Sequence, residues 1–172
     1  GDGSQLLTST LVGTDQTDQA FFIDIDNDED VWIYGQSAGD WPVVGGGYST
    51  PSGKLYVSKF NPDLDELLVS SRIGPGTGFN GDAAPVAFLV DRCDRIYICG
   101  YNASSGFELT DDNLFDTGSF VLCAWEEDMS ELAFSTYYGG NHVDGGTSRF
   151  DKSGIVYQGV CNSGAFPTNP DA

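Results

Sequence analysis

The sequence has few basic residues. Only 7 of its 172 residues are Lys or Arg, against 26 Asp and Glu, and the formal net charge is −19. Nucleic acids and anionic membrane surfaces are both bound through clusters of basic side chains. The composition therefore predicts neither a nucleic-acid partner nor an acidic membrane surface as a partner. No apolar run approaches the roughly 20 residues of a membrane-spanning helix, so we also expect no membrane insertion.

The sequence also lacks the cysteine spacing of zinc sites and the apolar periodicity of helices. None of its 4 cysteines forms a Cys-x-x-Cys pair, which argues against a structural zinc site. Disulfides and buried free thiols both remain open for Cys93, Cys99, Cys123 and Cys161. No segment sustains an apolar period of 3.6 residues between helix caps, so almost no helix is expected.

Two short phrases recur along the chain. The first reads LLTSTLVG from Leu6, LLVSSRIG from Leu67 and LAFSTYYG from Leu132. The second is an apolar run that ends in glycine, as VWIYG, IYICG and IVYQG. Two phrases that recur on nearly the same spacing indicate one structural unit used repeatedly.

Each full unit contains four short runs rich in Val, Ile, Tyr, Phe and Trp, separated by Gly, Asp, Asn and Pro. This alternation is typical of strands and turns. We expect strands at 20–25, 31–35, 55–60 and 67–71, at 86–90, 96–100, 120–125 and 132–137, and at 147–150 and 155–159. Tandem units of four antiparallel strands predict an all-β protein made of β-propeller blades.

The unit boundaries suggest about two and a half blades within a propeller segment spanning residues 1–172. A closed propeller has about 4–8 blades. We therefore interpret the chain as a fragment of a larger propeller, whose remaining blades belong to the same or a neighbouring chain. Residues 6–13 would be the outer strand of a preceding blade, followed by blades at 19–74 and 84–139 and a partial blade at 146–172.

The third unit resembles a known family. The stretch FDKSGIVYQG at 150–159, followed by Phe-Pro-Thr at 166–168, resembles the SBBP-type β-propeller repeat, and Asp-Trp-Pro at 40–42 fits the same pattern. Residues 132–140 are similar to the closing strand of that repeat. Residues 142–151 resemble large surface proteins of gliding Bacteroidota that carry sorting domains for type IX secretion. The resemblance implies a propeller at the bacterial cell surface with an adhesin-like role, although Phe107 is followed by Glu108 where the family has Pro.

Antiparallel connectivity places the long loops, 36–54 and 101–118, at one end of the blades together with the connections between units. Long loops on a rigid scaffold commonly carry binding sites. The candidate binding residues at this end are Trp41, Tyr48, Phe107, His142 and Asp144. Trp41, Phe107 and Phe166 each follow the glycine of the second phrase by a similar number of residues. The alternative is therefore that these side chains anchor their own loops to the blade.

The turn DIDNDED at 24–30 is the most acidic stretch. Asp26, Asp28 and Asp30 alternate in a way that lets carboxylates converge on a hard cation, so calcium is the one cofactor considered. The alternative is a β-turn capped by its first aspartate, which recurs as Asp91 and Asp151.

No catalytic motif stands out. The only histidine, His142, lies near Asp144 and Ser148, but no Gly-x-Ser-x-Gly elbow is present. We therefore expect no enzymatic activity and predict an extracellular scaffold that binds surface proteins or glycans. A structural repeat in a surface filament or stalk is the alternative, and a propeller hydrolase or lyase is less favoured.

Overall fold

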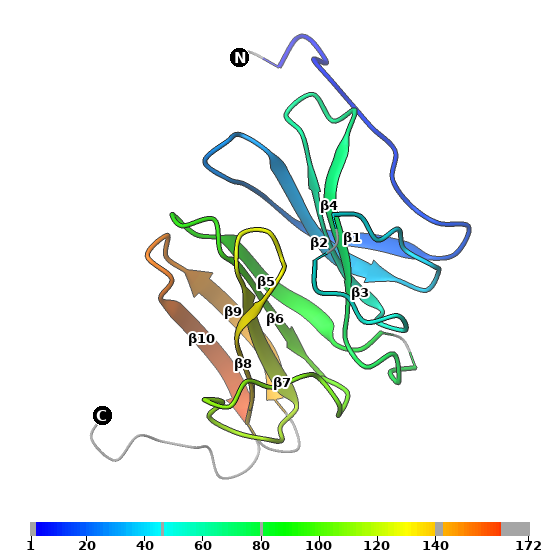
Figure 1. Cartoon of the computed structure of the whole chain (residues 1–172). Helices are drawn as coiled ribbons and strands as arrows, with labels where there is room; N and C mark the ends of the chain where they lie inside the picture. Colours follow the sequence, from blue (N-terminus) through cyan, green and yellow to red (C-terminus); the bar gives the residue numbers. More distant parts are fainter. Residues whose placement is uncertain (1–2, 46, 80, 140–142, 163–172) are drawn as a thin grey trace.

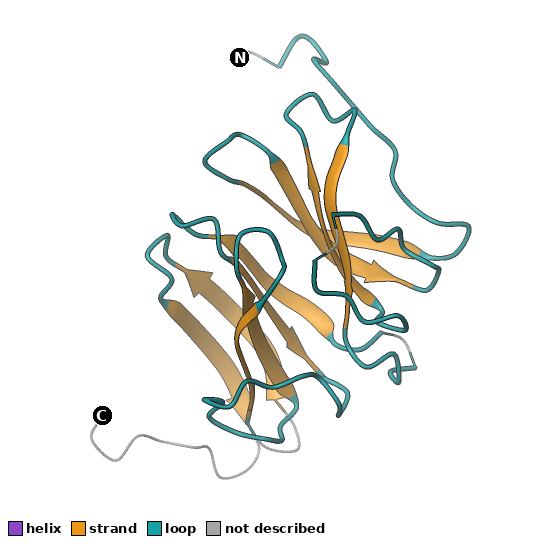
Figure 2. Cartoon of the chain, viewed as in Figure 1, coloured by secondary structure: helices purple, strands orange, loops and turns teal. Residues whose placement is uncertain are grey.

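The computed structural model describes residues 3–45, 47–79, 81–139 and 143–162. Over these ranges the chain is all-β, with ten strands and no helix (Figure 2). No helix in the described ranges is long and apolar enough to cross a membrane.

The strands form three antiparallel sheets in which neighbours along the chain are neighbours in space (Figure 1). The first sheet contains β1 (Asp18–Ile25), β2 (Val31–Ser37), β3 (Leu55–Phe60) and β4 (Leu67–Ile73). The second contains β5 (Ala84–Val90), β6 (Ile96–Tyr101), β7 (Phe120–Trp125) and β8 (Leu132–Tyr138). The third pairs β9 (Val143–Phe150) with β10 (Val156–Asn162). None of these sheets closes on itself.

The predicted strands of both full units are confirmed, and β3 and β7 begin and end at the predicted residues. The expected strand at 6–13 does not form. A strand needs a neighbour for its backbone hydrogen bonds, and no described strand pairs with this segment. The segment instead passes the first sheet, where the Thr8 hydroxyl donates to the Asp63 carbonyl at 2.6 Å, and Leu11 is fully exposed.

The first two sheets pack face to face. Side chains alternate along each strand, so Trp32 and Tyr34 of β2 point to the same side, and the Tyr34 ring lies 5.8 Å from the ring of Phe88 on β5. The shared core contains Trp32, Tyr34, Leu55, Val57 and Ile73 from the first sheet and Val90, Ile96, Ile98, Val121 and Trp125 from the second. Burial of these side chains is the main stabilising contribution at this interface.

The second sheet is buried on its other face as well. Ala87, Cys99 and Phe120 form a second buried cluster there, and β9 contacts both β5 and β6. Burial on both faces explains why its strands are apolar almost throughout. Cys99 and Cys123 are buried free thiols and Cys93 is an exposed free thiol.

The first sheet differs because one of its faces is partly bare. Ile23 of β1 is equivalent to Phe88 of β5, because they pair with Ile33 and Ile98 at matching positions of the next strand. Ile25 is equivalent to Val90 in the same way, since they pair with Val31 and Ile96. Val90 is fully buried against the first sheet, whereas Ile23 is 70% exposed and Ile25 is 55% exposed. Equivalent positions in the two sheets therefore have opposite environments.

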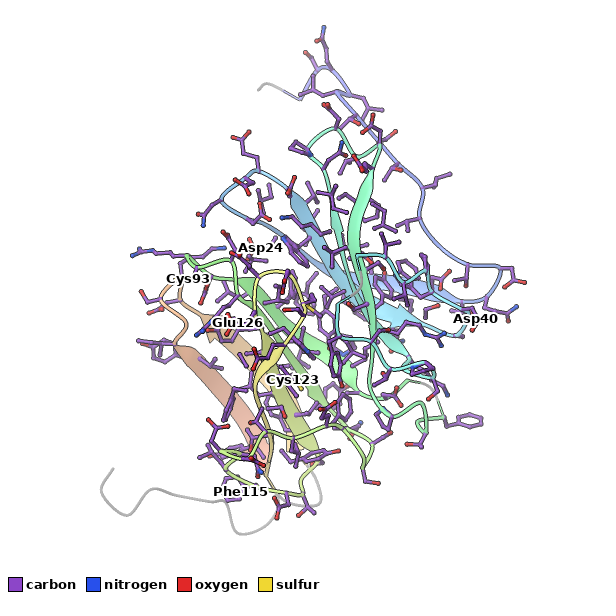
Figure 3. The ribbon with its side chains drawn as sticks, in the orientation of Figure 1. Asp24, Asp40, Cys93, Phe115, Cys123 and Glu126 are labelled. Atoms are coloured by element: carbon purple, nitrogen blue, oxygen red, sulfur yellow. The ribbon has the colours of Figure 1, made fainter. Side chains whose placement is uncertain are left out.

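The first strands of the sheets lie in series, with β1 against β5 and β5 against β9. Asp24 of β1 joins them: its carboxylate accepts a hydrogen bond from the Val90 amide at 2.9 Å and pairs with the Lys152 ammonium at 2.9 Å. Lys152 also donates to the Val90 carbonyl at 2.6 Å. Figure 3 labels Asp24 between the first two sheets. One lysine from the β9–β10 turn thus ties together all three sheets.

Replacing Lys152 with methionine should lower the free energy of unfolding by about 0.5 kcal/mol, because the ion pair is partly exposed and screened by solvent. Addition of about 1 M salt should reduce the difference between wild type and variant further. Urea denaturation at both ionic strengths measures this. A loss above about 2 kcal/mol, or a loss insensitive to salt, would contradict an ion-pair role.

Candidate functional site

The two ends of the sheets differ in loop length. The connections β2–β3 (38–54), β4–β5 (74–83) and β6–β7 (102–119) lie at one end, which we call the loop end. The opposite end, the turn end, carries only short connections. In Figure 3, Cys93 marks the turn end of the second sheet and Phe115 marks its loop end. This arrangement follows from the antiparallel order of the strands, as the sequence predicted.

Two adjoining hollows lie at the loop end, where the first sheet meets the β4–β5 connection. Their volumes are about 380 Å³ and 360 Å³, and both are lined by Gln36, Phe79 and Gly81. Gln19 and Lys54 line the first hollow, and Asn102 lines the second. We call this continuous depression the amide groove and define it by Gln19, Gln36, Phe79 and Asn102.

The amide groove combines planar amides with one exposed ring. Gln36 Nε2 donates to Gln19 Oε1 at 2.7 Å, and these residues are direct partners in the β1–β2 ladder. The Phe79 side chain is 97% exposed. None of the described residues that line either hollow carries a carboxylate. Lys54, the one charged lining residue, donates its ammonium hydrogen bond to the Gly78 carbonyl.

The carboxylate of Asp82 holds the loops around the groove. It is fully buried, and it accepts hydrogen bonds from the amides of Lys54 at 2.8 Å, Gly76 at 2.9 Å and Gly78 at 3.2 Å. These donors come from both the β2–β3 and β4–β5 connections. Asp82 therefore fixes the backbone of the residues that precede Phe79.

Asp18 has a similar role in the first sheet, where the chain enters β1. Its carboxylate accepts hydrogen bonds from the Thr14 amide and the Ser37 hydroxyl, both at 2.5 Å. Burial acts to raise the pKa of Asp18, but the hydrogen bonds from Ser37 and Thr14 outweigh it and leave the pKa below the ordinary value of 3.8. Asp18 thus stays ionised near neutral pH and fixes the backbone at the start of this strand.

The predicted binding residues that the structure describes do not share one site. Trp41 is 3% exposed, its ring stacks on Tyr56 with centroids 3.6 Å apart, and its indole nitrogen donates to Ser58 at 3.0 Å and to Ser70 at 3.1 Å. Phe107 is 7% exposed. Both side chains are covered by their own sheets, so their interpretation as binding residues is replaced by the alternative, in which they pin their loops.

Tyr48 and Asp144 are not among the described residues that line the amide groove. Tyr48 is half-buried with its ring 5.6 Å from Trp125, and it lines a separate hollow with Glu108. His142 lies outside the described residues. Asp144 lies on β9 and pairs with Cys161 of β10. This position is equivalent to that of Asp18 on β1, which pairs with Ser37 of β2.

The acidic turn contains an ion pair between Lys59 and two of the carboxylates considered for calcium. Asp26 accepts hydrogen bonds from the amides of Asp28 at 3.0 Å and Asp30 at 2.9 Å, and from the Trp32 indole at 2.8 Å. The Lys59 ammonium lies 2.9 Å from Asp26 and 2.8 Å from Asp30. The cationic position is thus taken by a lysine. Within the described chain, no group of three or more acidic, His or Cys side chains could hold a metal ion.

The capping alternative describes this turn well. Asp91 Oδ1 accepts hydrogen bonds from the amides of Cys93 at 2.7 Å and Arg95 at 3.1 Å, and Asp151 accepts from the Ser153 amide at 2.8 Å. The same side-chain cap therefore recurs in the first hairpin of every sheet. It is a feature of the scaffold rather than a site.

Replacing Asp26 with asparagine should lower the free energy of unfolding at pH 7 by about 2 kcal/mol, because Lys59 loses a charge partner and buried donors lose an anionic acceptor. Burial raises the pKa of Asp26, but the hydrogen bonds from Lys59, Trp32 and Asp30 outweigh it and leave the pKa below 3.8. The stabilisation is therefore fully present above pH 3.8 and is lost as the pH falls through the lower native pKa.

Urea denaturation from pH 7 down to about pH 2 measures this dependence. The difference between wild type and Asp26→Asn should shrink as the pH falls. The exposed neighbour Asp28 is the matched control, and Asp28→Asn should change the stability by less than about 0.5 kcal/mol. A constant difference at all pH values would show that Asp26 acts without its charge.

Sequence reasoning missed the amide groove. Counting back from the β1–β2 turn would pair Gln36 with Ala20, because the irregularity between Ala20 and Phe22 shifts the register by one residue and brings Gln19 opposite Gln36. Phe79 belongs to a loop, and no sequence signal places it beside these glutamines. The groove depends on how the β4–β5 connection packs against the first sheet.

No family model matches this chain, and a search of curated proteins also finds no match.

Proposed function

We propose that this chain is a run of β-propeller blades that serves as a non-catalytic scaffold at a bacterial cell surface and binds surface proteins or glycans through its loop end. The resemblance of residues 142–151 to large surface proteins of gliding Bacteroidota is the basis for the extracellular setting and for export by type IX secretion. The amide groove is the observation that carries the binding role.

Three features support propeller geometry. Each sheet is an antiparallel meander of the kind found in blades. The first strands β1, β5 and β9 contact one another in series, as innermost strands do around an axis. The bare face at Ile23 and Ile25 is equivalent to the face of the second sheet that the first sheet covers. A further sheet packed there would cover these isoleucines as the first sheet covers the half-buried Phe88 and the fully buried Val90.

The chemistry of the amide groove favours binding over catalysis. Proton transfer and covalent catalysis need carboxylate, His, Cys or activated hydroxyl groups in reach of one another. The described lining instead offers neutral amides, hydroxyls, the exposed Phe79 ring and Lys54, whose ammonium donates to the Gly78 carbonyl. Such a surface makes hydrogen bonds and stacking contacts with a ligand that it does not transform.

The binding of the labelled chain to cell envelopes of the organism that encodes it tests this proposal. Phe79→Asp at the loop end should weaken binding at least about tenfold, because a carboxylate replaces the ring in the groove. Arg92→Ser at the turn end changes the net charge by the same amount at an exposed position and should leave binding unchanged. Equal effects of the two variants would refute a binding role for the loop end.

Treatment of the envelopes distinguishes the two partner classes. Protease treatment should abolish binding to a surface protein, and periodate oxidation should abolish binding to a glycan. Loss of binding only after protease treatment still supports the scaffold and assigns it a protein partner.

A further inference from the structure

We infer that the amide groove binds neutral sugar rings of a glycan, with Phe79 as the stacking platform and the side-chain amides of Gln19, Gln36 and Asn102 as hydrogen-bonding partners. This inference rests on the proposed function, because it requires the loop end to be the binding surface. It goes further by choosing glycan over protein and by specifying an uncharged ligand.

The exposed ring is the first argument. A phenylalanine side chain buries a large apolar area when a ligand covers it, yet Phe79 is 97% exposed although it borders both hollows. The chain that precedes it is held by Asp82, which accepts hydrogen bonds from the amides of Gly76 and Gly78. Phe79 is therefore presented from an anchored loop. The C–H face of a pyranose ring is an apolar surface of matching shape.

The second argument is the arrangement of amides around that ring. An amide side chain has two N–H donors and one carbonyl acceptor, which suits neighbouring sugar hydroxyls that both donate and accept. The bond from Gln36 Nε2 to Gln19 Oε1, at 2.7 Å, orients both side chains and uses one donor and one acceptor of the pair. The remaining donors and acceptor of the pair can serve a ligand. Asn102 supplies a third amide across the second hollow.

Charge is the third argument. The chain carries 26 acidic residues, yet none of the described residues lining the amide groove is acidic. A site for a cationic peptide or amine would use carboxylates, which this chain has in excess. The ammonium of Lys54, the one charged lining residue, donates to the Gly78 carbonyl, and an anionic glycan would be repelled by the net charge of −19. A neutral, hydroxyl-rich ligand is what remains, and each hollow has a volume typical of small-ligand sites.

Isothermal titration calorimetry of the chain with hexasaccharides tests the inference. The probes are cellohexaose, maltohexaose, mannohexaose and chitohexaose, with hexagalacturonic acid as the anionic comparison. At least one neutral probe should bind at about 10 mM, a concentration well above a Kd of about 1 mM. The anionic probe should bind at least about tenfold more weakly than that neutral probe.

The variants connect binding to the groove. Phe79→Ala should weaken the affinity at least about tenfold, and Phe79→Trp should preserve it, because stacking needs an aromatic ring. Leu114→Ala is the matched control: Leu114 is 67% exposed on the β6–β7 connection and does not line the groove. It should leave the affinity unchanged.

The inference is overturned if no neutral probe binds, if the anionic probe binds as tightly, or if Phe79→Ala behaves as Leu114→Ala does. That failure is distinguishable from failure of the proposed function. If Phe79→Asp still removes envelope binding and protease treatment abolishes it, the scaffold role stands with a protein partner. If envelope binding is insensitive to Phe79→Asp, the proposed function itself fails.

Discussion

Replacing Asp82 with alanine should lower the free energy of unfolding by about 3 kcal/mol, because three buried amide donors lose their acceptor. The Asp82 side chain is fully buried and accepts from the amides of Lys54, Gly76 and Gly78. An alanine leaves these three amides without their acceptor. Urea denaturation followed by far-ultraviolet circular dichroism measures the loss.

Two control variants separate the hydrogen bonds from the rest of the side chain. Asp82→Asn keeps one oxygen acceptor and should lose about half as much stability. Asp15→Ala removes an exposed aspartate from the chain before β1 and should change the stability by less than about 0.5 kcal/mol. Equal stabilities of Asp82→Ala and Asp15→Ala would show that the carboxylate does not hold the two loops.

Replacing Gly35 with alanine should also be strongly destabilising, by about 3 kcal/mol or more. A Cβ at Gly35 would lie 2.1 Å from the Gln19 carbonyl oxygen and 2.6 Å from the Tyr56 hydroxyl. The first of these is backbone within the β1–β2 hairpin, next to the irregularity between Ala20 and Phe22, so it has little freedom to move. The strand pair would have to separate locally.

The equivalent glycine of the second sheet gives a graded comparison. A Cβ at Gly100 would lie 2.7 Å from the Ala83 Cβ and 3.3 Å from the Ala84 carbonyl oxygen. Gly100→Ala should therefore be destabilising, but less so than Gly35→Ala. Thermal and urea denaturation of both variants check the order, and the reverse order would contradict a steric explanation for the repeated glycine.

Repetition made the scaffold predictable. The glycine that ends the second phrase recurs because Gly35 and Gly100 lie where another strand approaches closely. The turn aspartates recur because each caps a hairpin. The residue three positions after each of them, Glu29, Asp94 or Gly154, has a positive φ. Local rules of this kind need only the residues of one hairpin. Sequence reasoning therefore located the strands to within a few residues.

Features that depend on distant residues were not predictable in this way. The Lys59 that pairs with Asp26 and Asp30 lies on β3, across the sheet from the acidic turn, so local spacing suggested calcium. The pattern around Trp41 equally suited a binding residue, and only its contacts with Tyr56, Ser58 and Ser70 show that it is buried. The amide groove likewise arises where separate connections meet.

Cryo-electron microscopy of the full-length protein that the gene encodes tests the central claim, the arrangement of these sheets as propeller blades. We predict that another four-stranded antiparallel sheet covers Ile23 and Ile25 and that β1, β5 and β9 surround one axis with their counterparts. Ile23 and Ile25 facing solvent, or sheets stacked in a line without a common axis, would contradict the propeller and support a filament or stalk.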